Sequence, residues 1–211
     1  MRPTWITAFI DLPGPSWDDG VAFWQAVTAT GLSALRGEDD EFATLLPADG
    51  EAFLRVQRTG AELPGIHLDL HGVGQQWEVR TSPGGFAFCA NVAAGGERPV
   101  PVAWPEGHRS LVDQVCLDIP PDAYDEECAF WAGLTGWELA PTSAPYMMQL
   151  VRPAGMPLRV LLQRRDEGDG PVTAHLDLAT TDREAEVARH LALGASVDGG
   201  ANVRQVDAQP T

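Results

Sequence analysis

The sequence of 211 residues contains no lysine, because all 14 of its basic residues are arginines. Reactions that need a lysine amine are therefore excluded, among them Schiff-base chemistry and phosphate binding by a Walker-type loop. The 30 acidic residues give a formal net charge of -16 at pH 7. Because nucleic acids and anionic membranes are bound largely through Lys and Arg, this charge argues against both as partners.

Long hydrophobic runs are also absent, and cysteines are few. No stretch approaches the roughly 18 apolar residues of a membrane-spanning helix, and the N-terminal residues do not have the pattern of a signal peptide. The three cysteines, Cys89, Cys116 and Cys128, form no C-x-x-C pair. An odd number of cysteines is typical of buried thiols in a reducing compartment. We therefore expect a cytoplasmic protein without disulfides.

An internal repeat is the most informative feature that the sequence does have. The segment 9–13 recurs at 116–120, and Phe23-Trp24 recurs as Phe130-Trp131, both at an offset of 107 residues. His-Leu-Asp-Leu occurs at 67–70 and again at 175–178. We predict two homologous domains, over 1–92 and 109–211, joined by a linker at 93–108 that is rich in Gly and Pro. Trp104 is expected to pin this linker to a domain surface.

Each half is expected to begin with a strand, a helix and several further strands. In the first half the helix runs from an N-cap at Ser16 to a C-cap at Gly31, and Asp49-Gly50 predicts a hairpin. In the second half the box Thr181–Glu184 predicts an additional helix that ends at Gly194, with Val187, Ala188 and Leu191 on its apolar face. The expected strands cover 4–12, 42–46, 52–58 and 65–70, then 111–119, 146–151, 157–164 and 173–178, and a helix covers 122–135.

The sequence resembles the vicinal oxygen chelate superfamily. The resemblance lies in this βαβββ order, in the two His-Leu-Asp-Leu strands, and in the segments Trp17–Gly31 and Thr181–Ala195. That superfamily includes glyoxalase I, bleomycin-resistance proteins and extradiol dioxygenases. More narrowly, the sequence resembles glyoxalase-like proteins of actinobacteria with two such domains in tandem. The resemblance implies an α+β fold in which tandem βαβββ modules form curved mixed sheets, with helices on the outer face and a small-molecule pocket on the concave face.

The sequence departs from the family pattern in two places. Only six residues, 71–76, separate the strand at 65–70 from Trp77, so the helix that the family has there does not fit, and the second module of the first domain is shortened. The segment Trp77–Cys89 is similar to the closing hairpin of the family, but the second half has no counterpart of it. One half, or a partner in a homodimer, is therefore expected to complete the other.

Strand geometry places the candidate site residues. Alternation puts His67 and Asp69 on one face of their strand, with Leu68 and Leu70 on the other, and the strand over 53–58 repeats the pattern. If the leucines face the core, the polar side chains line the pocket. The candidate ligand-binding residues are Arg55, Gln57, His67 and Asp69 in the first half, and Gln163, His175 and Asp177 in the second. A solvated face or ordinary hydrogen-bonded pairs would produce the same pattern.

The resemblance also implies a divalent metal such as Zn, Ni, Fe or Mn. One ligand of the family commonly opens the strand that His67 and His175 occupy, and Gln114 lies near the position of another. Where metal-binding relatives have a Glu on the closing strand, this sequence has Cys89. Catalytic metal sites generally need about three protein ligands, and neither half offers an obvious set. No cofactor is therefore assigned.

Three functions stay open. The first is a binding protein for a small organic molecule that works without a complete metal site, as in the bleomycin-resistance branch. The second is a metal-dependent lyase, isomerase or dioxygenase of the same superfamily. The third is a non-catalytic scaffold or degenerate duplicate. All three stay open because a fold alone does not determine a function.

Overall fold

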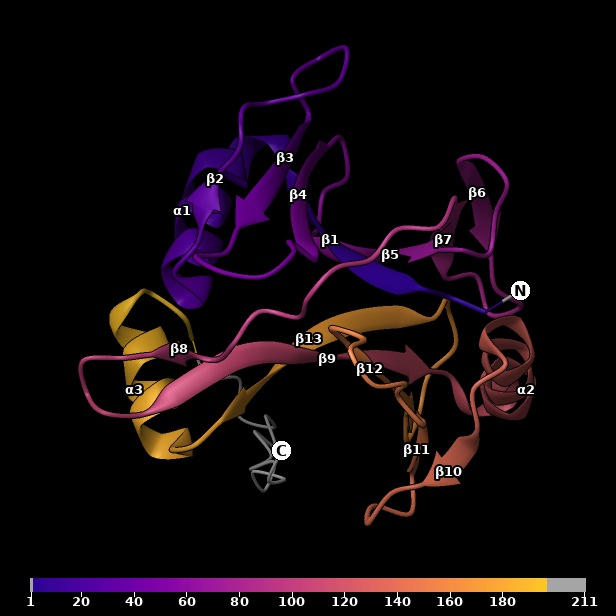
Figure 1. The fold of residues 1–211 in the computed structure, drawn as a ribbon. Coiled ribbons are helices and arrows are strands. Elements are labelled where there is room, and N and C mark those ends of the chain that lie inside the picture. The colour runs from indigo at the N-terminus through magenta and orange to yellow at the C-terminus, as the bar shows by residue number, and fades with distance from the viewer. Residues whose placement is uncertain (1, 197–211) are drawn as a thin grey trace.

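Two β-sheets packed face to face form the centre of the molecule (Figure 1). The computed structural model describes residues 2–196. In the first sheet seven strands lie in the order β2-β3-β4-β1-β5-β7-β6. Their bounds are β1 Trp5–Pro13, β2 Gly31–Leu32, β3 Phe42–Leu46, β4 Leu54–Thr59, β5 Gly65–His71, β6 Glu78–Thr81 and β7 Ala87–Asn91.

The second sheet has six strands, five of them in the order β10-β11-β12-β9-β13, with β8 paired to β9. Their bounds are β8 Val102–Ala103, β9 Arg109–Ile119, β10 Leu139–Pro141, β11 Met147–Leu150, β12 Arg159–Arg164 and β13 Thr173–Thr180. The helices are α1 Trp17–Thr28, α2 Tyr124–Thr135 and α3 Arg183–Ala192, and single 3-10 turns at Gly14–Ser16 and Pro121–Ala123 precede the first two.

Strand pairing follows the repeat. β1 pairs in parallel with β4 and antiparallel with β5, and β9 pairs in the same way with β12 and β13. The predicted α+β class and the βαβββ order are confirmed. The boundaries of the two domains, at 92 and 109, stay a prediction.

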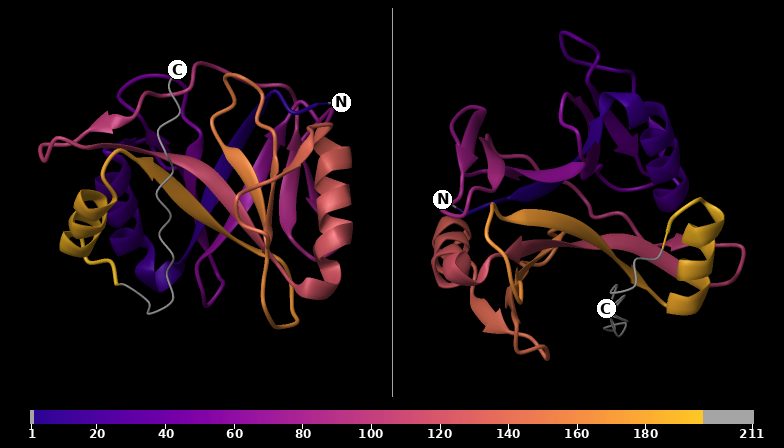
Figure 2. Two further views of the ribbon diagram at one scale, coloured as in Figure 1. Left: turned by 90° about the horizontal axis from the view of Figure 1, so that it is seen from below. Right: turned by 180° about the vertical axis from the view of Figure 1, so that it is seen from behind.

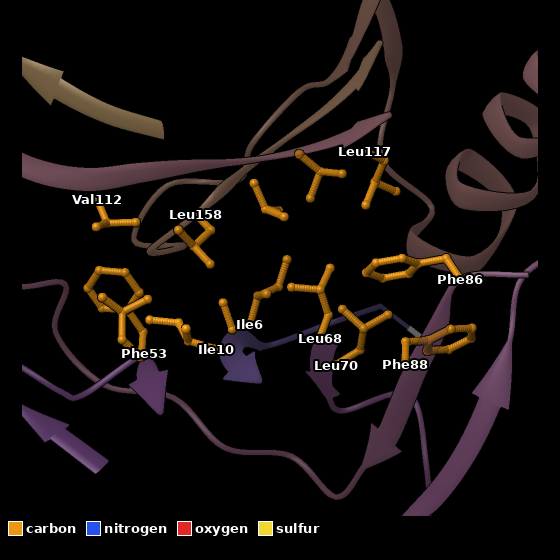
Figure 3. Packing of buried hydrophobic residues seen from close by; sticks show 14 of the residues in the cluster. Ile6, Ile10, Phe53, Leu68, Leu70, Phe86, Phe88, Val112, Leu117 and Leu158 are labelled. Carbon is orange, nitrogen blue, oxygen red and sulfur yellow. The ribbon is translucent and has the colours of Figure 1, made fainter. Parts of the chain in front are cut away.

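One hydrophobic core joins the two halves. The apolar faces of β1 and β5 carry Ile6, Ile10, Leu68 and Leu70, and they meet apolar residues of the second sheet such as Leu117 (Figure 3). The burial of the leucines confirms the alternation expected for the His-Leu-Asp-Leu strands. Because this core faces inward from both sheets, the polar faces of the two sheets point away from each other.

The helices lie on the core side of the sheets, opposite the polar faces, and at the two ends of the interface between the sheets (Figure 2). At one end α3 contacts α1, since the Arg189 guanidinium donates to the carbonyls of Ala26 and Val27 at 3.1 and 2.9 Å. At the other end the hairpin of β6 and β7 packs on α2, where the rings of Phe86 and Phe88 lie 6.0 and 5.2 Å from Trp131. Each half therefore covers part of the other.

The linker is ordered by contacts with both halves. Its β8 segment pairs with β9, and Trp104 donates from Nε1 to Ser110 Oγ at 2.8 Å. The guanidinium of Arg189 lies 3.6 Å from the centre of the Trp104 ring, a cation–π contact. The expectation that Trp104 pins the linker is confirmed.

The predicted helix ends were partly wrong. Ser16 occupies the N-cap of α1, but its hydroxyl donates to the Pro13 carbonyl and caps no backbone N–H. The C-cap of this helix is Ala29, whose φ of 51° lies in the left-handed region, and Gly31 belongs to β2. The corresponding cap of α2 is Gly136, with a φ of 64°.

Two predictions for α3 were also wrong. Asp182, and not Thr181, caps the helix by accepting the Ala185 N–H at 3.0 Å. The inward face carries buried Glu186, while Ala188 and Leu191 are exposed. The physical reason is that His108 of the linker offers Glu186 a hydrogen bond, which a buried carboxylate needs.

The two departures from the family pattern have different outcomes. Within residues 2–196 no helix separates β5 from β6, as the short spacing predicts. The place where a closing hairpin of the second half would follow α3 lies outside the described residues. Over the same residues, no helix is both long and apolar enough to cross a membrane.

Candidate functional site

Each sheet presents a row of polar side chains on the face opposite the shared core. The first polar face consists of Asp11, Arg55, Gln57, His67, Asp69 and Cys89, on β1, β4, β5 and β7. The second polar face consists of Gln114, Cys116, Asp118, Gln163, His175 and Asp177, on β9, β12 and β13. The apolar neighbours of these residues, such as Leu68, Val56 and Leu117, are buried in the core, so strand alternation fixes both faces.

A histidine–aspartate pair occurs at the same place on both faces. His67 Nδ1 donates to Asp11 Oδ2 at 2.8 Å, and His175 Nδ1 donates to Asp118 Oδ2 at 2.7 Å. A carboxylate on Nδ1 fixes the orientation of the imidazole and directs Nε2 away from the pair. The two halves therefore hold an imidazole in the same way.

On the first polar face, two carboxylates are incompletely satisfied. Asp69 is buried, and Arg55 Nη1 lies 3.9 Å from its Oδ2. The other oxygen of this carboxylate, Oδ1, is buried without a hydrogen-bond partner, and so is Asp11 Oδ1. Buried polar atoms are nearly always paired, so two such orphans on one face indicate a missing donor or cation.

Other groups of the first face shape its chemistry. Burial, and then the charge of Asp69, raise the pKa of the Cys89 thiol to about 12, so the thiol is neutral at physiological pH. Burial lowers the pKa of His71, whose Nε2 lies 3.1 Å from Thr7 Oγ1. The His67 ring stacks on Phe9 at 4.5 Å. This face therefore combines carboxylate acceptors with an aromatic neighbour.

On the second polar face the carboxylate equivalent to Asp11 accepts a hydrogen bond on each of its two oxygens. Asp118 Oδ1 accepts from Gln163 Nε2 at 3.2 Å, in addition to the bond from His175. Hydrogen bonds to Asp118 and then to Cys116 raise the pKa of His175 to about 11, so this imidazole is a cation at neutral pH. Burial raises the pKa of Asp177, whose Oδ1 lies 3.6 Å from His175 Nε2. His175 is thus held on both sides.

An arginine cluster adjoins the second polar face. Arg98 of the linker, Arg152 and Arg159 lie 2.5, 2.7 and 3.0 Å from the buried carboxylate of Asp113. Three guanidiniums around one carboxylate leave an excess of positive charge in a strongly acidic protein. Asp113 occupies an irregularity of pairing between β9 and β13, which turns it away from the regular alternation of β9.

Two groups of three potential metal ligands occur among the described residues. His67, Asp69 and Cys89 form one, and Cys116, Asp118 and His175 form the other, each with its donor atoms within 4.8 Å of one another. Imidazole, carboxylate and thiolate are all ligands of zinc, and three of them with an open position suit a catalytic site. The orphaned Asp69 Oδ1 belongs to the first group, so the first group fits a cation better. In the second group the protonated His175 would first have to lose its proton.

The structure brings together most of the residues predicted from the sequence. His67, Asp69 and Arg55 lie on one face, and His175, Asp177 and Gln163 on the other. Gln57 pairs across from Asp11 in the strand register, and Gln114 across from Asp177. Cys116, which the predicted set did not include, belongs to the second group of potential metal ligands described above.

Sequence reasoning missed the arginine cluster around Asp113. Arg98 comes from the linker and Arg152 from a loop, so no spacing along the chain connects them with Asp113. It also missed Asp11 and Asp118 as partners of the histidines in the site, although their repetition at an offset of 107 residues (11 to 118) was the available signal.

Comparisons with known proteins define the class of the fold. A Mn(II)-bound glyoxalase from Novosphingobium aromaticivorans superposes with a TM-score of 0.55 at 17% identity, over 90% of this chain and 69% of that chain. A 2,2',3-trihydroxybiphenyl 1,2-dioxygenase from Sphingomonas wittichii strain RW1 gives a TM-score of 0.57 at 12% identity, over 91% of this chain and 77% of that chain. A fusion protein of a xylose isomerase-like TIM barrel and 4-hydroxyphenylpyruvate dioxygenase gives a TM-score of 0.58 at 12% identity. The match covers 92% of this chain but only 38% of the fusion protein. The fold is that of the vicinal oxygen chelate superfamily, as the sequence resemblance implied.

The family comparison is more specific for the second half. Residues 114–208 match the family model of the glyoxalase-like domain. That segment is a little under half of the chain, and it starts inside β9. No curated protein matches the sequence.

Proposed function

We propose that the protein binds a small hydroxylated aromatic molecule on its first polar face. One observation carries the proposal: Asp11 Oδ1 and Asp69 Oδ1 are buried acceptors without a donor, beside an imidazole. A ring hydroxyl of such a ligand supplies a donor to one of these acceptors. The exposed Trp77 offers a flat apolar surface for a ring.

The solved structures of similar fold support this choice of ligand class. Two of them are named as dioxygenases of catechol and of 2,2',3-trihydroxybiphenyl, molecules with adjacent ring hydroxyls. At 12% identity this likeness establishes the fold alone, so the ligand class depends on the orphaned oxygens. The same considerations favour the first face over the second, whose corresponding carboxylate is already satisfied.

Catechol is the probe that tests the proposal. It is expected to raise the melting temperature of the protein, because a ligand that binds only the native state stabilises it. Asp11→Asn should weaken catechol binding at least tenfold in titration calorimetry. Asp118→Asn, at the repeat-equivalent position, should leave it unchanged. No heat of binding and no thermal shift with catechol or with related phenols would overturn the proposal and favour a scaffold without a ligand.

A second candidate function is a divalent metal site at His67, Asp69 and Cys89. The observation that favours it is that one of these three grouped donors, Asp69, has an orphaned oxygen. The metal would supply Lewis-acid chemistry, as in metal-dependent members of the superfamily. Because Cys89 has a pKa of about 12, metal uptake would displace its proton, and the apparent affinity would rise with pH.

Elemental analysis separates this candidate from metal-free binding. After dialysis against Zn, Ni, Fe or Mn salts, a metal site predicts one bound ion per chain. Cys89→Ser should lower that stoichiometry, and Cys116→Ser, at the other group of donors, should not. Absence of a stoichiometric ion after reconstitution would remove the candidate. We further propose a cytoplasmic location, in accord with three buried free cysteines.

A further inference from the structure

A cavity of about 500 Å³ lies between the two halves. Its walls are the end of α1 with the following turn, the loop after β3, the linker over 99–103, the start of β9 and Leu178 of β13. None of the residues of the two polar faces lines it. Pockets for small molecules commonly have volumes of about 300 to 1,000 Å³ and occur where domains meet.

The lining of this cavity is mostly apolar and comes from both halves. Leu45, Phe53 and Val112 are almost fully buried at its floor, and Figure 3 shows Phe53 and Val112 on opposite sides of the interface. Val100, at 63% exposure, belongs to the linker wall and reaches the surface. The interior of a protein is otherwise close-packed, so an apolar opening of this size leaves its lining without contacts that a ligand would restore.

The linker wall is held in place by specific bonds. Val100 N–H donates to Asp49 Oδ1 at 3.0 Å, and Glu51 N–H donates to the Glu97 carbonyl at 2.7 Å. Gly50 lies so close to this segment that a Cβ there would come within 2.7 Å of the Pro99 nitrogen. The cavity is therefore formed before any ligand binds, which lowers the entropy lost on binding.

The cavity has two charged lining residues, and they differ in how far they are satisfied. Asp49 already accepts the Val100 N–H. The guanidinium of Arg109 makes no hydrogen bond or ion pair with the part of the chain that the structure describes, although its backbone is fixed by Thr181. The unsatisfied charge of the cavity is thus positive, and it lies at the exposed start of β9.

We infer that this cavity binds a small amphipathic carboxylate, whose apolar body lies between the halves and whose acid group pairs with Arg109. The apolar lining supplies most of the affinity, and the bidentate guanidinium–carboxylate pair supplies orientation and selectivity for acids. The site is separate from the first polar face, so the two ligands bind independently.

Titration calorimetry with sodium decanoate and with decanol tests the inference on the full chain. Decanoate should bind with a 1:1 stoichiometry and more tightly than decanol. Arg109→Gln should weaken decanoate binding about tenfold and leave decanol binding unchanged. A purely apolar site would show no such difference between the two ligands. Saturating catechol should not displace decanoate, so failure of the polar-face proposal and failure of this one are distinguishable.

Tryptophan substitutions locate the site. Val100→Trp, at an exposed position that tolerates a larger side chain, should block the mouth and weaken decanoate at least tenfold. Leu178→Trp should fill the interior with the same result. Val151→Trp, at another exposed valine outside the cavity, serves as the control and should bind as the unaltered protein does. Unchanged decanoate binding by a folded Val100→Trp protein, or displacement of decanoate by catechol, would overturn the inference.

Discussion

Each of the two polar faces contains a histidine–aspartate pair at the equivalent position, but the groups around the two pairs differ. On the first face, His67 and Asp11 lie beside carboxylate oxygens that lack partners. On the second, His175 and Asp118 are tied to Gln163, Cys116 and Asp177, and three arginines gather around Asp113 of the same strand as Asp118. The comparison teaches that the pair belongs to the repeated architecture, while the surrounding groups determine what each face can bind.

The halves also differ in the pieces that they have kept. The first has the closing hairpin of β6 and β7 but no second helix, and the second has α3 but no closing hairpin within the described residues. Each of these pieces packs on the opposite half, the hairpin on α2 and α3 on α1. Matched substitutions at equivalent positions of the repeat can therefore show how unequal the two halves have become.

The largest expected effect comes from the tryptophans at the equivalent positions 24 and 131. Trp131 is almost fully buried against Phe86 and Phe88, and its Nε1 donates to the buried Glu127 at 2.7 Å. Trp131→Ala should lower the free energy of unfolding by about 3–5 kcal/mol. Trp24 is only partly buried, so Trp24→Ala should cost clearly less. Urea unfolding of both variants measures the difference, and equal losses would contradict the unequal packing.

The arginine cluster gives the next largest effect. Asp113→Ala removes the carboxylate that three guanidiniums share, which leaves like charges close together. A loss of about 3 kcal/mol in the free energy of unfolding is expected, as for other buried pairs that lose one partner. High salt should recover part of the loss by screening the arginines. No change in stability would show that the cluster is held by packing alone.

Helix α3 gives the third test, a dependence of stability on pH. Burial alone would raise the pKa of Glu186, but hydrogen bonds from His190, Arg189 and His108 outweigh it and hold the pKa well below the ordinary 4.5. A lowered pKa stabilises the fold above pH 4.5, and this contribution is lost as the pH falls below that value. Glu186→Gln should remove the contribution, so thermal melts of variant and parent should converge as the pH falls below 4.5. A difference that stays constant with pH would contradict the assignment.

The smallest effect concerns the C-caps of the first two helices. Ala29 and Gly136 occupy equivalent positions, and both have a positive φ. A non-glycine residue in this conformation costs about 1 kcal/mol. Ala29→Gly should therefore raise the free energy of unfolding by about 1 kcal/mol, and Gly136→Ala should lower it by a similar amount. Thermal unfolding of both variants measures this, and changes of the same sign would show that other contacts dominate.

Much of the fold could be predicted from the sequence because its signals are local or repeated. Alternation along β5 and β13 places the polar residues on one face, and the nearly constant offset places the halves in register. The buried face of α3 could not be predicted in this way. Its inward Glu186 is satisfied by His108, which is 78 residues away in the chain. Apolar periodicity alone pointed to Leu191, which is exposed.

The candidate site shows the same limit. His67 and Asp69 follow from strand alternation, but the cluster around Asp113 depends on an irregularity in β9 and on Arg98 from the linker. The cavity between the halves depends on how the two sheets pack against each other. Neither a bulge nor the packing of distant segments leaves a periodic trace in the sequence.

Strand β13 has a consequence for how the protein behaves at high concentration. In the first sheet β7 covers the outer edge of β5, but among the described residues no strand covers the outer edge of β13. An uncovered edge of eight residues is a template for pairing with another chain. The charged side chains of His175 and Asp177 along this strand oppose such self-association. Neutralising them would turn a tolerated edge into a starting point for aggregation.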